Sequence, residues 1–532
     1  MLTQYIDLSR CKAPWVAIGL LVGCGSVSGS SSDAGSASLA LSPGSVDFGV
    51  VAYRKPSAPT ALTLTNNGRV ASGTLAIAIS GANAADFTET DDCAGTLAPG
   101  ASCTISVEIT ASALESRSGS LTVTGSVGAA SATLTAIGDY AYGDLTDLAR
   151  WQTVDVTSIN ASAYGYNGST FDGRYVYFVP GIVNNGLVVR CDSSVPFTAA
   201  SCSTFDLKSI NTNAKGYIGA SFDGRYVYLV PNSNTAGASG DDGLAARYDT
   251  QSPFTQASSW SIFDLTSVDA NAKGFMGATF DGRYIYYAPY SHSVAVRFDT
   301  HSPFDQVNSW RTFDLSSVNA SASGFRGTVF DGRYVYFIPA DKVVTRFDTQ
   351  ASFTQATAWE TFDLTSVDAN AWLFWGGAFD GRYVYFSPGY NSVAARYDTQ
   401  ASFTDASAWS VFDITVANPK GTGFWGAVFD GRRVYFAPYY NGDTVHGAKS
   451  LIVAYDTAGP FAQSGSWSTF DLTNVNPGAY GFMGAAFDGN AVYFVPMTGS
   501  TIARFAARDP VGALPQLCAS ATALHCFSGS FL

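Results

Sequence analysis

The chain has 532 residues, a formal net charge of −13 and a sequence pI of about 4.7. Nucleic acids and anionic membrane surfaces both require a basic binding surface, so this acidic balance argues against either as a partner. Hydrophobic residues make up 46% of the sequence and aromatic residues 14%, which is ample core material for an all-β protein.

The first 24 residues are predicted to be a targeting segment. Arg10 and Lys12 form a positively charged flank, and 13–23 is an apolar run too short to span a bilayer. The run ends in Leu-Val-Gly-Cys24, which resembles the lipobox of bacterial lipoproteins. That resemblance implies a lipid on Cys24 and, because Gly25 follows it, a place at the outer membrane or cell surface. The alternative is an ordinary signal peptide with a chance cysteine.

Residues 25–37, nearly all Gly, Ser and Ala, are predicted to be a flexible tether. Residues 38–140 then carry short, alternating, Thr- and Ser-rich segments that predict a β-sandwich. The series at 45–49, 62–68, 86–105 and 118–123 resembles the immunoglobulin-like ASH (ASPM/SPD-2/Hydin, or choice-of-anchor) domain of bacterial surface proteins. The resemblance implies a spacer, and it departs from the family at 52–56, where a glycine-containing turn is more usual.

Residues 145–506 are organised around a repeated phrase, Phe-Asp-Gly, followed in the first copy by Arg-Tyr-Val-Tyr-Phe and in the others by the same or a similar run. The phrase begins at Phe171, Phe222, Phe280, Phe330, Phe379, Phe429 and Phe487. An Asp-Gly pair between alternating apolar runs predicts a hairpin with a type I′ turn, in which both residues have φ > 0. A period near fifty residues with several strands per unit predicts a β-propeller.

Each unit is expected to hold four strands, of which the fourth begins with Trp and continues to Phe-Asp three residues later. The seventh unit lacks this fourth strand, and a matching segment lies before the first unit at 151–156. We therefore predict a seven-bladed propeller whose last blade is completed by a strand from the N-terminal side, because closure leaves no unpaired sheet edge.

Six cysteines besides Cys11 and Cys24 fall into close pairs: Cys93 with Cys103, Cys191 with Cys202, and Cys518 with Cys526, the last pair in a tail at 507–532. Cys191 and Cys202 stand where other blades have an aromatic residue and a tryptophan, as in Tyr248 and Trp260. This coupled replacement predicts that the two positions face each other across a hairpin. Three disulfides indicate an exported protein.

No catalytic motif is present in the sequence: it contains no HExxH, G-x-S-x-G or P-loop, and no cofactor or metal is expected. The Asp and Arg residues repeated in every blade, such as Asp172, Arg174, Arg190 and Asp206, are interpreted as turn formers and blade contacts. Carboxylates that occur once, in the variable loops between the second and third strands, are the candidates for acid–base chemistry: Asp241, Asp242, Asp341 and Asp443.

Two positions at the start of the innermost strand vary while their neighbours hold, and they predict the binding site. Their residues, with the variable-loop tyrosines, give a cationic and an aromatic half of the channel mouth. The cationic candidates are Lys215, Lys273 and Arg326; the aromatic ones are Trp372, Trp375, Trp425, Tyr164, Tyr480, Tyr290, Tyr390, Tyr439 and Tyr440. We expect one contiguous aromatic surface facing the cations across the channel. The alternative is that the aromatics cap the core.

Three functions remain open from sequence. The leading hypothesis is a monomeric, lipid-anchored, non-enzymatic protein that binds a glycan or an extracellular protein at the mouth, with aromatic stacking and a cationic subsite for a carboxylate or sulfate. The second is a glycan hydrolase or lyase, and the third is a passive envelope or adhesion element. Fold alone does not choose among them.

Overall fold

The computed structural model describes residues 38–126, 128–181, 185–235, 241–440 and 449–509. The chain divides into two compact units, 1–139 and 140–532. Within the described ranges both units are built from strands, with three-residue 3-10 turns in some of the connections, and no helix is long and apolar enough to cross a membrane.

Three of the predicted features lie outside the described residues. They are the signal segment with Cys24, the tether at 25–37, and the tail that contains Cys518 and Cys526. Of the three predicted disulfides, the structure contains the first two. The third, between Cys518 and Cys526, stays a prediction.

The first unit is a sandwich of two four-stranded sheets. One sheet has the order β1 (Leu39–Ser42), β3 (Thr60–Asn66), β6 (Ser102–Ile109) and β5 (Phe87–Asp91); the other has the order β2 (Ser45–Ala52), β8 (Gly128–Asp139), β7 (Ser116–Gly125) and β4 (Ala76–Ser80). Alternate residues of both sheets pack into one core, because successive side chains of a strand point to opposite faces. In the segment where the ASH resemblance fails, Arg54 has φ 57°, a conformation that glycine adopts at lower cost.

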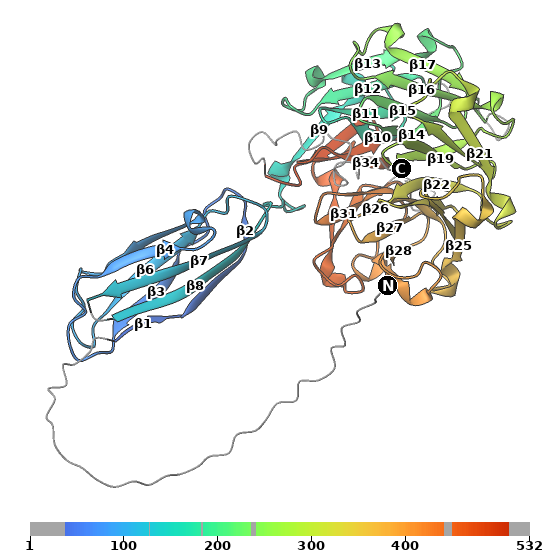
Figure 1. The fold of residues 1–532 in the computed structure, drawn as a ribbon. Coiled ribbons are helices and arrows are strands. Elements are labelled where there is room, and N and C mark those ends of the chain that lie inside the picture. Colours follow the sequence, from blue (N-terminus) through green and yellow to red (C-terminus); the bar gives the residue numbers. More distant parts are fainter. Residues whose placement is uncertain (1–37, 127, 182–184, 236–240, 441–448, 510–532) are drawn as a thin grey trace, which may run out of the picture. The chain divides into compact units, whose positions relative to one another are not determined.

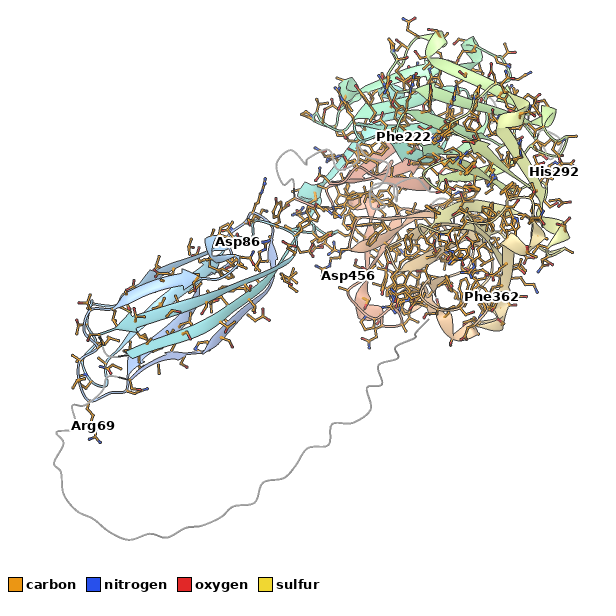
Figure 2. The ribbon with its side chains drawn as sticks, viewed as in Figure 1. Arg69, Asp86, Phe222, His292, Phe362 and Asp456 are labelled. Atoms are coloured by element: carbon orange, nitrogen blue, oxygen red, sulfur yellow. A yellow bond between two sulfur atoms is a disulfide. The ribbon has the colours of Figure 1, made fainter. Side chains whose placement is uncertain are left out.

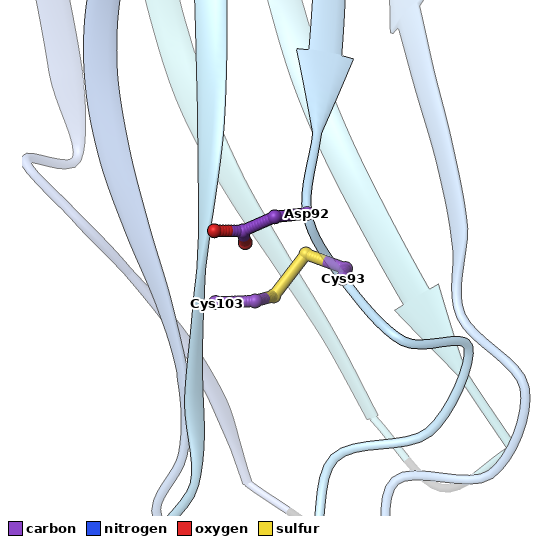
Figure 3. A group of neighbouring side chains, drawn as sticks. All are labelled: Asp92, Cys93 and Cys103. Atoms are coloured by element: carbon purple, nitrogen blue, oxygen red, sulfur yellow. A yellow bond between two sulfur atoms is a disulfide. The ribbon is translucent and has the colours of Figure 1, made fainter.

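The disulfide between Cys93 and Cys103 links the end of β5 to β6, as the cysteine spacing predicts. Figure 3 shows the Asp92 carboxylate beside this disulfide, and its Oδ1 accepts a hydrogen bond of 2.6 Å from the Thr104 backbone N–H. Metals bind cysteine as the thiolate, so two sulfur atoms joined in a disulfide make this group unsuitable as a metal site.

The second unit contains seven four-stranded antiparallel sheets (Figure 1). The first strands of the sheets are β10 (Tyr166–Phe171), β14 (Tyr217–Phe222), β18 (Phe275–Phe280), β22 (Phe325–Phe330), β26 (Phe374–Phe379), β30 (Phe424–Phe429) and β34 (Phe482–Phe487). Each first strand contacts the first strands of the two neighbouring sheets, and β34 contacts β10, so the ring is closed. This is the arrangement of a seven-bladed β-propeller.

The other strands follow outward in sequence order. The second strands are β11 (Tyr175–Pro180), β15 (Tyr226–Pro231), β19 (Tyr284–Pro289), β23 (Tyr334–Pro339), β27 (Tyr383–Pro388), β31 (Arg433–Pro438) and β35 (Val492–Pro496). The third strands are β12 (Leu187–Asp192), β16 (Leu244–Asp249), β20 (Val294–Asp299), β24 (Val343–Asp348), β28 (Val393–Asp398), β32 (Leu451–Asp456) and β36 (Thr501–Phe505). The fourth strands are β13 (Cys202–Asp206), β17 (Trp260–Asp264), β21 (Trp310–Asp314), β25 (Trp359–Asp363), β29 (Trp409–Asp413), β33 (Trp467–Asp471) and, for the last sheet, β9 (Trp151–Asp155).

The Phe-Asp-Gly turn differs from the predicted type I′ turn. Of the two residues Asp172 and Gly173, only Gly173 has a positive φ, 98°. The two central residues of the turn are Gly173 and Arg174, and Asp172 and Tyr175 flank them. The Asp172 side chain accepts from the backbone N–H groups of Arg174 and Tyr175 and from the Tyr177 hydroxyl. An aspartate that bonds nearby backbone in this way removes the need for a second positive-φ residue.

Tryptophans of the fourth strands join neighbouring blades. Each stacks on the phenylalanine of the preceding fourth strand; Phe362, labelled in Figure 2, and Trp409 have ring centroids 4.9 Å apart and planes 3° apart. Such aromatic pairs contribute about 0.5–1.5 kcal/mol beyond the area they bury. In the first blade Cys191 and Cys202 pair in register and form a disulfide where Tyr248 pairs with Trp260 in the second blade.

The last blade is completed by β9, which pairs antiparallel with β36 from Thr501↔Asp155 to Phe505↔Trp151. Trp151 contacts Phe470 and Phe505, and its indole N–H donates to the Leu145 carbonyl. Beside this seam, Arg508 packs on the rings of Tyr140 and Tyr142 and donates to the Asp430 carbonyl. Both ends of the propeller segment therefore hold the ring closed.

Candidate functional site

One face of the propeller brings together the loops between the second and third strands and the segments that lead into the innermost strands; we call this face the mouth. The backbone N–H groups of Tyr290 and Tyr439 in such loops donate to the carbonyls of Gly274 and Gly423, which stand just before the innermost strands. The lengths of these loops vary most, and functional residues commonly lie on variable loops held by a rigid frame.

A β-bulge in each innermost strand directs one residue per blade toward the channel axis. The register shifts between Phe275 and Ala278, with positive φ at Gly277, and the same shift recurs in every blade. Bulges re-aim side chains in this manner. The residues that precede the bulge glycine in five blades therefore pack in one apolar cluster: Ile218, Met276, Trp375, Trp425 and Met483.

Trp375 and Trp425 do not form the exposed surface that the sequence predicts. Their exposed fractions are only 1% and 5%, and their ring centroids lie 4.4 Å apart. Tyr390 and Tyr439 cover them from the loops, with centroids 4.4 Å from Trp375 and 5.2 Å from Trp425. These two tryptophans cap the channel core, because they pack with Ile218, Met276 and Met483 from three other blades.

Arg326 lies against this aromatic group and not across the channel from it. Its guanidinium carbon is 4.5 Å from the Trp375 ring centroid, 5.0 Å from that of Trp425 and 4.8 Å from that of Tyr290. Its Nη2 donates to the Tyr290 hydroxyl at 3.0 Å. Burial lowers the pKa of Arg326, although the guanidinium stays charged at neutral pH. The separation into a cationic and an aromatic half is thus wrong at this residue.

The exposed aromatic side chains of the described residues all belong to the mouth. They are Tyr164, Trp372, Tyr390 and Tyr480, with exposed fractions of 45%, 43%, 51% and 38%. Three of them occupy the equivalent position two residues before an innermost strand, and Tyr390 projects from the loop that contacts Trp375. Lys215 and Lys273, at the same equivalent position in blades two and three, are half-buried. We call these six residues the rim.

Leu373 is a residue of the mouth that the motif pattern does not predict. It has φ 60°, and the equivalent residue in the other six blades is a glycine with φ between 66° and 73°. Its N–H donates to the Asp341 carbonyl of the preceding blade, as the Gly274 N–H does to the Asp242 carbonyl. Non-glycine residues held in this conformation cluster at functional sites. An internal alignment of the seven repeats carries the signal, since glycine is missing from one copy.

The carboxylate candidates lie in different surroundings. Asp241 accepts from the Ser291 hydroxyl at 2.8 Å and lies 3.3 Å from Nε2 of His292. Burial raises the pKa of Asp242 to about 6, against hydrogen bonds from the N–H groups of Leu244 and Gly243 and the charge of Lys215. Asp341 is exposed, and Asp443 lies outside the described residues.

The residues repeated in every blade have structural roles, as expected. Asp206 caps a 3-10 turn by accepting from the Lys208 N–H, and Arg174 pairs with Asp192 at 2.7 Å. Arg190 lies between the Tyr175 ring of its own blade and the Phe254 ring of the next, 4.1 and 4.3 Å from their centroids.

No protein-family model matches the sequence, and comparison with curated proteins gives no match either. Among solved structures, the chain is similar to YCF48 from Cyanidioschyzon merolae, with 12% identity over 67% of this chain and 98% of that one and a TM-score of 0.40. It is also similar to the ASH/PapD-like domain 7 of human CEP192, with 15% identity over 24% of this chain and 99% of that one and a TM-score of 0.18. With TM-scores this low, neither likeness bears on function.

Proposed function

We propose that this protein is a non-enzymatic binding protein that recognises a saccharide at the mouth of its propeller. The observation that carries the proposal is the gathering of Tyr164, Trp372, Tyr390 and Tyr480 on the rim, where each keeps more than a third of its surface in solvent. Elsewhere in the described residues, tryptophans and phenylalanines are packed between blades or in the cores. Exposed aromatic residues gathered on one face mark a binding surface.

Saccharides suit these side chains for a physical reason. The C–H faces of a sugar ring are apolar, and flat aromatic rings cover such faces while leaving the hydroxyl groups free to hydrogen-bond. Lys215 and Lys273 add charged donors to the same rim. Stacking of this kind needs no catalytic acid.

The test is a glycan array probed with the purified full-length chain, followed by calorimetry on the best ligand. Trp372→Ala and Tyr390→Ala should each weaken binding by about 5- to 150-fold, the range for losing a central aromatic contact. Val307→Ala, another exposed apolar position but in a loop before a fourth strand, is the matched control and should bind as wild type. Equal losses in all three variants, or no saccharide bound, contradict the proposal.

Enzymatic action on glycans is the competing function, and the same ligands test it. Incubation of each bound glycan with the wild-type chain, followed by mass analysis, should return the glycan unchanged. Cleavage that disappears in Asp241→Asn or Asp242→Asn would replace the binding proposal with a hydrolase or lyase.

The proposal includes attachment to the cell envelope through a lipid on Cys24, with the first unit as a spacer. Its support is the lipobox-like sequence, the short apolar run before it and the two disulfides, which persist in oxidising compartments. A surface-anchored receptor for saccharides fits these features.

A further inference from the structure

We propose that Arg326 binds one anionic group of the ligand, a carboxylate or a sulfate, at the centre of the mouth, so that the ligand is an acidic saccharide. This inference rests on the proposed saccharide-binding function and adds the chemical class of the ligand. It concerns the group that Arg326 forms with Tyr290, Trp375 and Trp425, which we call the throat.

The first observation is that Arg326 has no acidic partner among the described residues. Several other arginines of the propeller pair with carboxylates, as Arg225 does with Asp249 at 2.8 Å. The contrast is sharpest with Arg346, which is also largely buried and whose Nε donates to Glu360 at 2.7 Å. Arg190 and its equivalents Arg247, Arg297 and Arg396 also lie between aromatic rings, but they occupy one repeated position of the blade contacts. Arg326 combines such ring contacts with a variable position at the mouth.

The second observation is that several N–H donors of the throat have no acceptor in the protein. A guanidinium has five N–H groups. Of those on Arg326, one from Nη2 goes to Tyr290, and the buried Nε has no protein acceptor. The indole Nε1 atoms of Trp375 and Trp425 are likewise buried without an acceptor. The throat thus holds several unpaired donors.

The third observation is that the repeat does not require a charge here. The equivalent position holds methionine in blades three and seven, Met276 and Met483, and isoleucine in blade two. A largely buried cation without a counter-charge costs folding free energy. Contact with three aromatic faces offsets only part of that cost. An arginine retained under these conditions is explained by a ligand that completes its hydrogen bonds.

The geometry suits an oxyanion in particular. The Tyr290 hydroxyl accepts from Nη2, and the guanidinium carbon lies within 5.0 Å of both tryptophan ring centroids, so the planar fork is held in place. Arginine recognises carboxylate and sulfate-like groups by two parallel N–H···O bonds. The rim aromatics around the throat would stack on the sugar ring that carries the anionic group.

The experiment measures, by calorimetry on the full-length chain, affinity for three oligosaccharides that differ at one group: a hexuronate, its methyl ester and a 6-sulfated neutral analogue. The wild type should bind the ester at least 10-fold more weakly than the acid, a difference of about 1.4 kcal/mol. The sulfated analogue tells whether the site takes any anion or carboxylate alone.

The decisive variant is Arg326→Met, because methionine occupies this position in two other blades and folding should persist. It should bind the acid and the ester equally well and still bind the ester as the wild type does. Arg333→Gln, which removes an exposed arginine paired with Asp348 in the same blade, is the matched control and should keep the acid preference.

A second readout is independent of sugar affinity. Glucuronate should change the fluorescence of Trp375 and Trp425 in the wild type and not in Arg326→Met. Equal affinity for acid and ester in the wild type overturns the inference while leaving saccharide binding intact. Failure to bind any of the three by a chain that binds another saccharide on the array also overturns the inference, whereas no saccharide bound at all overturns the proposed function itself. Preference for the acid that survives in Arg326→Met assigns the anion to Lys215 or Lys273 instead and also overturns the inference.

Discussion

Trp372 and Trp375 are three residues apart, yet one is 43% exposed and the other 1% exposed. Trp372 precedes the innermost strand, whereas Trp375 is its second residue and points toward the axis. An aromatic side chain loses most of its solvent contact at the second residue of the strand but not two residues before the strand. We therefore expect substitution of Trp375 to affect stability and substitution of Trp372 to affect binding.

We expect Trp375→Ala and Trp425→Ala each to lower the free energy of unfolding by about 3–5 kcal/mol, the usual loss when a buried aromatic site is emptied. Trp372→Ala should lower it by less than about 1 kcal/mol. Urea denaturation followed by circular dichroism measures both. A small effect in both buried variants would contradict the capped channel.

Leu373 is the residue at which the mouth departs from its own repeat. Leu373→Gly should release the strain of a positive φ, about 1–2 kcal/mol, and lose side-chain packing of similar size. The unfolding free energy should therefore stay within about 1 kcal/mol of wild type, while saccharide affinity falls if the strained leucine positions Trp372. A loss above about 3 kcal/mol would show that Leu373 serves packing alone.

Asp242 gives the mouth a pH dependence. Its pKa is raised by burial to about 6 from the usual 3.8, so the folded protein holds this proton more tightly than the unfolded chain does. The resulting stabilisation is complete below about pH 4 and is lost as pH rises through 6, by about 3 kcal/mol at most.

Asp242→Asn should flatten the stability profile between pH 4 and 6 and make the protein more stable than wild type at pH 7. Thermal unfolding at a series of pH values measures it. Asp341→Asn, an exposed carboxylate two blades further on, is the matched control and should leave the profile unchanged. A profile with the same slope in Asp242→Asn would refute this assignment.

Among the single strands, β9 matters most for closure of the propeller, although it has only five residues. It supplies the outer edge of the last sheet, and its Trp151 fills the position that each other fourth-strand tryptophan fills in its own blade. Without β9, the backbone groups of β36 would lose their partners and present an open edge.

Deletion of 145–158 should therefore open the ring or cause self-association. Size-exclusion chromatography with light scattering measures the association, and calorimetry measures the melting temperature. Deletion of 441–448, in the variable loop between β31 and β32, is the control and should leave both unchanged. A monomer with the wild-type melting temperature after the first deletion would mean that closure does not depend on β9.

For the whole molecule, the anchoring prediction concerns residues outside the described ranges. Cys24→Ser should release the protein from the membrane fraction, because the predicted thioether-linked lipid is the attachment. Ultracentrifugation of cell lysates with immunoblotting measures it, with Cys11→Ser as the control that should stay in the pellet. Unchanged pelleting of Cys24→Ser would contradict the lipoprotein assignment.

Much of the propeller could be predicted from sequence because its determinants are local and repeated. The Phe-Asp-Gly turn, the alternating strand after it and the fourth-strand tryptophan recur in order, so seven copies and one displaced strand predicted the sheet order and the closure by β9. The exchange of an aromatic pair for Cys191 and Cys202 likewise predicted which strands face each other, because register follows from a two-residue period. Cys518 and Cys526 have no such repeat to compare with, so their pairing rests on spacing alone.

The character of the mouth was decided only by tertiary structure. Sequence identified Trp372, Trp375, Trp425 and Arg326 as variable residues at one end of the channel, but their exposure depends on how closely seven innermost strands approach the axis. That approach buries Trp375 and Trp425, brings Arg326 from another blade against them, and leaves Trp372 in solvent. The exposed fraction of a side chain at the axis depends on the side chains of all seven blades. The sequence of a single repeat therefore does not predict it.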